Sequence, residues 1–100
     1  MDNQEQTAYQ EKMDAKLTQL KADIQKLEGE LKDQKADARL GMQEELQQLR
    51  RRRESVKAKL HELKTASGAA WGEAKGGVAS AWHDLEAAFH KASAEFKRER

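Results

Sequence analysis

The spacing of apolar side chains between Tyr9 and Leu31 constrains the fold of this chain most strongly. The apolar residues follow one another in steps of four or three positions, which is the spacing of the stripe along a coiled-coil helix. Charged and amide side chains, which favour helix or solvent, fill the positions between them. The stripe comprises Tyr9, Met13, Leu17, Leu20, Ile24, Leu27 and Leu31. We therefore predict an amphipathic helix that buries this stripe against another helix.

The same pattern returns after a gap over residues 32–41, where Ala38 alone fits it. It continues in Met42, Leu46, Leu49, Val56, Leu60 and Leu63, with Arg53 in a stripe position. The steps after Ala38 form a stutter, which unwinds a supercoil locally without ending the helix. The chain has no proline, and no Asn-Gly pair marks a turn here. We call both sets of apolar residues together the seam.

One helix from about residue 5 to about residue 65 is therefore expected, about 90 Å long at 1.5 Å per residue. In this interpretation residues 1–66 form the long coiled-coil helix and residues 67–100 form the rest of a single all-α domain. The alternative is a turn near residues 35–41. Such a turn would give three helices of similar length, as in a three-helix bundle.

The last third of the chain begins at the sequence KTASGAAWG, where Ser67 can cap a new helix and Gly68 can adopt the backbone angles of a reversal. A separate helix is predicted from about residue 69 to about residue 97. Its large apolar residues fall on one face and repeat with a period of 11 residues, which suits a straight helix. They are Trp71, Val78, Trp82, Leu85, Phe89 and Phe96. The segment is therefore expected to be an amphipathic tail that packs on the long helix.

Charge is balanced overall but unevenly distributed along the chain. The net charge is +1, with an excess of acidic residues over 1–34 and of basic residues over 35–66. This arrangement favours antiparallel pairing of one chain with another. The chain has no cysteine, which excludes disulfides and thiolate metal sites. The N-terminal residues resemble no signal peptide and no segment is apolar enough to span a bilayer, so we expect a cytoplasmic protein.

Four consecutive arginines, Arg50, Arg51, Arg52 and Arg53, form the strongest local cluster of charge. Neighbours on a helix lie 100° apart, so the four surround the helix and make no single stripe. Paired with acidic side chains they would form a solvated basic band; alternatively they could contact phosphate groups. Nucleic-acid modules usually add stacking aromatics or a reading helix, and neither is near.

The sequence gives little evidence of a catalytic or metal-binding site. His83, Glu86 and His90 lie roughly on one helical face and could contribute to a metal site, but no fourth ligand accompanies them. The chain has no glycine-rich phosphate loop and no nucleophile paired with a base. We therefore predict a protein that is not an enzyme and needs no cofactor or metal.

The order of segments resembles a known family. YQEKMDAKLTQLKADIQKLE is followed by ADAR, by LQQLRRRRESVKAKLHELK and by ASGAAWGEAKGGVASAWHDLEAAFHKA. This order is similar to that of small bacterial coiled-coil proteins described as stress-response proteins, whose type member is cyanobacterial. The resemblance implies a cytoplasmic, all-helical protein linked to stress. The chain departs from the family at Gly76 and Gly77, where larger polar residues are expected.

Three hypotheses about function follow. The leading one is a non-catalytic structural or interaction protein that self-associates through the seam, most simply as a homodimer, and offers helical surface to protein partners. Arg53 would help to set the register of that pairing. The second hypothesis is a peripheral protein whose amphipathic tail binds lipid or exposed apolar protein surface. In the third, the arginine cluster binds nucleic acid, although the near-neutral net charge argues against it.

Overall fold

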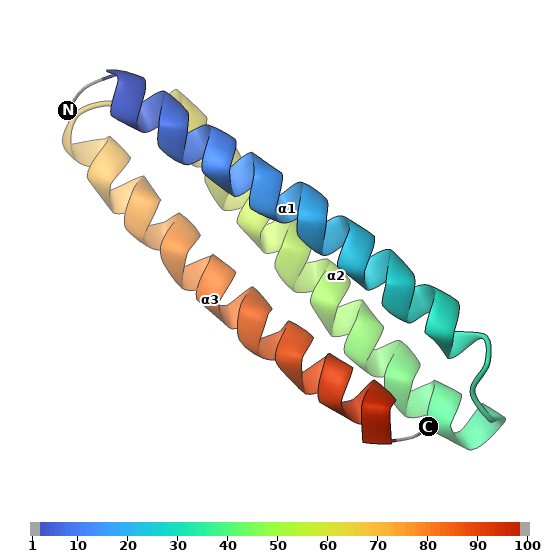
Figure 1. Cartoon of the computed structure of the whole chain (residues 1–100). Helices are drawn as coiled ribbons and strands as arrows, with labels where there is room; N and C mark the ends of the chain where they lie inside the picture. Colours follow the sequence, from blue (N-terminus) through green and yellow to red (C-terminus); the bar gives the residue numbers. More distant parts are fainter. Residues whose placement is uncertain (1–2, 99–100) are drawn as a thin grey trace.

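Three helices, each antiparallel to the next along the chain, form the part of the protein that the structure describes. The computed structural model describes residues 3–98 and contains α1 (Asn3–Leu31), α2 (Ala36–Thr65) and α3 (Ala69–Arg98). The chain runs along the bundle in α1, back in α2 and forward again in α3, so that α1 and α3 point in the same direction (Figure 1). The bundle measures 51 × 17 × 17 Å. The prediction of an all-α protein is confirmed.

The prediction of one helix over residues 5–65 is wrong, because the chain turns at residues 32–35. The turn lies just before the 35–41 segment of the alternative prediction, which gave the correct three-helix arrangement. Amide groups of Lys32, Asp33 and Gln34 each donate to the carbonyl three residues earlier and tighten the end of α1. Lys35 is extended, and the Arg39 guanidinium donates to the Gln34 carbonyl oxygen at 3.0 Å.

The physical reason for the turn is burial. Without it, the seam on α1 and the seam on α2 would both depend on another chain to cover them. With it, the two seams face each other and α3 within one molecule, and one chain covers its own apolar residues. Residues 32–35 themselves include no apolar side chain, so the reversal removes little from the core.

The second reversal lies where the sequence predicts it, at residues 66–68. Ala66 is extended and its amide donates to the Leu63 carbonyl at 3.2 Å. Gly68 has a φ of +60°, in the left-handed region that favours glycine. The amide of Trp71 donates to the Gly68 carbonyl at 3.1 Å, which starts α3.

The core extends along the whole bundle and is made of the predicted seam and tail residues. The half-buried members are Tyr9, Leu17, Leu31, Trp82 and Phe89. The fully buried members are Met13, Leu20, Ile24, Leu27, Met42, Leu46, Leu49, Val56, Leu60, Leu63, Trp71, Val78, Leu85 and Phe96, with Ala92. The seam therefore packs within one chain. No helix among residues 3–98 is long and apolar enough to cross a membrane.

The three helices do not pack equally closely. The backbones of α2 and α3 approach one another along most of their length, whereas α1 approaches α3 least. Small residues on α3 explain part of this difference: Gly77 lies against the side chain of Lys59, and a Cβ atom there would be 3.7 Å from the lysine Cδ. Grooves lie on the surface of the bundle between each pair of helices.

Candidate functional site

The first candidate site is an apolar groove between α1 and α3, which we call the aromatic groove. It has a volume of about 220 Å3. The apolar part of its lining comes from Leu20, Trp82 and Phe89, and both aromatic rings are half-buried. The ammonium of Lys16 lies 5.3 Å from the centre of the Trp82 ring, close enough for a cation–π interaction. The tail thus keeps part of its aromatic surface accessible.

The other large residues of the predicted tail lie inside the bundle. Trp71 is 1% exposed, and its ring meets the Tyr9 ring edge-on with the centroids 5.9 Å apart. The Lys75 ammonium lies 5.0 Å from the centre of the Tyr9 ring and 5.5 Å from that of Trp71. Burial raises the pKa of the Tyr9 hydroxyl above its ordinary value of 10.0. This aromatic pair fastens the start of α1 to the start of α3.

The four arginines do not form one patch. Arg50 makes an ion pair with Glu28 on α1 at 3.1 Å, whereas Arg52 reaches Asp84 on α3 at 4.0 Å. Arg51 is exposed. Arg53, in its predicted stripe position, is half-buried and lies 3.8 Å from Glu54. The cluster therefore connects α2 to both neighbouring helices.

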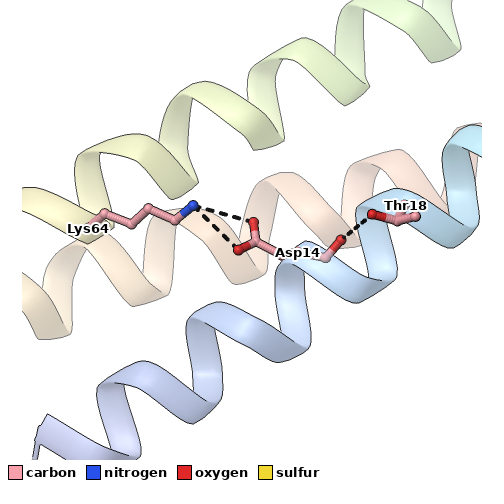
Figure 2. A network of polar contacts seen from close by, with 3 residues as sticks. All are labelled: Asp14, Thr18 and Lys64. Carbon is pink, nitrogen blue, oxygen red and sulfur yellow. Dashed lines mark hydrogen bonds and ion pairs between the residues drawn. The ribbon is translucent and has the colours of Figure 1, made fainter.

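A second groove, which we call the basic groove, separates α1 from α2 and has a volume of about 570 Å3. Leu17 and Leu60 supply its apolar lining. At one end Lys64 reaches both carboxylate oxygens of Asp14 at 3.4 Å, and the Thr18 hydroxyl donates to the Asp14 carbonyl at 3.0 Å (Figure 2). The remaining polar lining is Lys21, Arg53, Lys57 and His61.

Sequence reasoning identified only Arg53 among the cations of the basic groove. The others are separated along the chain and meet only because α1 and α2 turn back on each other. Their one local signal is the spacing of Arg53, Lys57, His61 and Lys64 in steps of four, four and three, which places them along one side of a helix.

The histidine and carboxylate set of α3 does not assemble into a metal site in the described part of the chain. No group of three or more potential ligands among residues 3–98 is placed to hold a metal ion. His83 is exposed, whereas Glu86 and His90 line the aromatic groove. Two of these three residues therefore belong to the rim of that groove.

No protein-family model, curated protein or solved structure matches this chain. The function is therefore inferred from the two grooves and from the way the seam is covered.

Proposed function

We propose that this protein is a non-catalytic interaction protein that pairs with a second copy of itself through the α1–α3 face. The observation that carries the proposal is the position of Trp82 and Phe89. Both rings lie half-buried beside Leu20 in the aromatic groove, while the rest of the large tail residues pack inside. Aromatic side chains at the centre of a face supply much of the binding energy in protein interfaces.

The charges around the aromatic groove favour a second copy as the partner. Lys16 lies at the Trp82 end, and Asp23 lies seven residues further along α1, about 10 Å away at 1.5 Å per residue. A two-fold axis through the groove would place Lys16 of each copy beside Asp23 of the other. A self-complementary patch of this kind is what a two-fold dimer requires.

The surface area of the bundle also suits a dimer. The molecule exposes 6667 Å2 of accessible surface. A standard stable interface buries about 800 Å2 on each partner. A dimer therefore needs to cover only about one eighth of the surface of each bundle.

This proposal changes the surface through which the chain would self-associate. The Leu/Ile seam was the surface expected from the sequence, but its residues pack against other helices of the same chain. A dimer of intact bundles must use another surface, and the aromatic groove offers apolar area together with matched charges. The link to stress stays a prediction from the resemblance in sequence.

Sedimentation equilibrium of full-length variants tests the proposal. We expect the wild-type protein to be dimeric at micromolar concentrations and Phe89→Glu to be monomeric. Leu40→Glu is the matched control, because it also replaces a large apolar side chain by glutamate. Leu40 is 68% exposed and lies outside the groove. Its dimer should persist.

A charge exchange sharpens the test. Lys16→Glu and Asp23→Lys should each weaken the dimer, and the double variant should restore it, because the exchanged charges again face each other across the two-fold axis. A monomeric wild-type protein would contradict the proposal. If that monomer also showed a blue shift of tryptophan emission on anionic vesicles, peripheral lipid binding would replace it.

A further inference from the structure

We propose that the basic groove binds a soluble anion that carries several phosphate groups. The inference is independent of dimer formation, because the basic groove lies between α1 and α2 and the proposed interface lies on the α1–α3 face.

The cations of the groove form a row along α2. The row consists of Arg53, Lys57, His61 and Lys64, and its ends are eleven residue steps apart, about 16.5 Å at 1.5 Å per step. Lys21 faces this row from α1. A row of separated positive charges suits an anion whose own charges are distributed along a chain better than it suits a single carboxylate.

Acidic side chains neutralise only part of this charge. Asp14 is paired with Lys64 at 3.4 Å. Glu54, which lies beside the groove, approaches Lys57 at 3.6 Å and Arg53 at 3.8 Å. The lysines and the arginine that line the groove on α2 outnumber these two acids, and Lys21 adds its charge from the opposite wall. The groove is therefore positive even without a charge on His61.

Arg53 points to the kind of group that would bind. Its side chain is 21% exposed, and its buried Nε has no hydrogen-bond partner within residues 3–98. A buried donor without an acceptor is unfavourable. The Nε itself lies out of a ligand's reach, so an oxyanion in the groove would contact the exposed part of the guanidinium. The planar guanidinium matches the geometry of phosphate oxygens, and lysines add charge without demanding one orientation.

The dimensions of the groove agree with a small ligand. Its volume of about 570 Å3 lies within the range of small-molecule sites, about 300–1,000 Å3. The apolar surface of Leu17 and Leu60 forms part of the lining and would contact the uncharged part of an organic phosphate.

Titration calorimetry with inorganic tripolyphosphate at low ionic strength tests the inference. The groove variant is Lys21→Gln combined with Lys57→Gln, since both side chains are exposed and their replacement leaves the core intact. The matched control is Lys26→Gln combined with Arg51→Gln, which removes the same charge from the same two helices outside the basic groove.

We expect the wild type and the control to bind tripolyphosphate with similar affinity. The groove variant should bind about a hundredfold more weakly, because it loses two charged hydrogen bonds and each loss weakens binding by about tenfold. Equal weakening in both variants would reduce the effect to net charge and overturn the inference. So would an absence of binding to tripolyphosphate. Vesicles of phosphatidylcholine with phosphatidic acid, and a single-stranded oligonucleotide, serve as further probes. Binding of either one without binding of tripolyphosphate would assign the groove to a membrane or to nucleic acid instead.

Discussion

The ring of Tyr9 meets the ring of Trp71 edge-on at a centroid distance of 5.9 Å. This contact joins residues 62 positions apart, near the beginning of α1 and at the beginning of α3. Of the three helix pairs, α1 and α3 have the fewest close backbone contacts. The aromatic pair is therefore one of the main connections between these two helices.

Replacement of Trp71 should therefore destabilise the bundle strongly. We expect Trp71→Ala to lower the free energy of unfolding by about 3–5 kcal/mol, the usual loss for a buried aromatic residue. Trp82→Ala should cost clearly less, because Trp82 is half-buried whereas Trp71 is 1% exposed. Urea unfolding followed by circular dichroism measures both. Equal losses would contradict the placement of the two rings.

Stability should fall at alkaline pH in a way that depends on Tyr9. Burial raises the pKa of its hydroxyl in the folded state above the ordinary value of 10.0, so the unfolded chain ionises first as the pH rises. The contribution of the protonated Tyr9 hydroxyl to the free energy of unfolding is complete below pH 10.0. It is lost as the pH rises through the folded-state pKa. Tyr9→Phe should remove this component of the pH dependence. Tyr9 is the only tyrosine, so its absorbance also reports the folded-state pKa directly.

Two glycine substitutions should act in opposite directions. Gly68 has a φ of +60°, and Gly68→Ala should destabilise the protein by about 1 kcal/mol. Gly76 lies inside α3 with open space around it, so Gly76→Ala should stabilise the protein by up to about 1 kcal/mol. Thermal unfolding of the two variants gives the comparison. A stabilising Gly68→Ala would show that the reversal differs from the one described.

A carboxylate in the core should prevent folding, whereas one on the surface of the same helix should not. Leu60 is 2% exposed and Leu40 is 68% exposed, and both belong to α2. Leu60→Asp should lose most of its helical circular dichroism, because an unpaired buried charge costs several kcal/mol in a small domain. Leu40→Asp should keep the wild-type spectrum. A folded Leu60→Asp protein would place the seam outside the core.

The apolar periodicity of the sequence predicted the core residues of this protein well. Apolar side chains that recur on one face of a helix are buried, whichever element packs against that face. Met13, Val56 and Leu85, one from each helix, are all buried as their spacing indicates. The same periodicity does not say which helix supplies the cover. One long helix paired with a second chain and two shorter helices paired with each other satisfy it equally.

The turn and the basic groove were beyond sequence reasoning for related reasons. Residues 32–35 contain neither glycine nor proline, so the two strongest turn signals are missing from the reversal. Without the reversal, Lys21 and Lys57 belong to distant parts of a rod. Once α1 and α2 lie side by side, the two lysines line one groove. The missing information was in each case a contact between segments far apart in sequence.

The turn between α1 and α2 has a practical consequence for engineering. Within residues 3–98, positive φ angles occur only at glycine, so residues 32–35 adopt backbone angles open to most amino acids. Asp33 and Lys35 are exposed, and neither belongs to the core. A short epitope tag spliced into this corner should leave the bundle folded, whereas the corner at Gly68 depends on its glycine and should accept such an insert poorly.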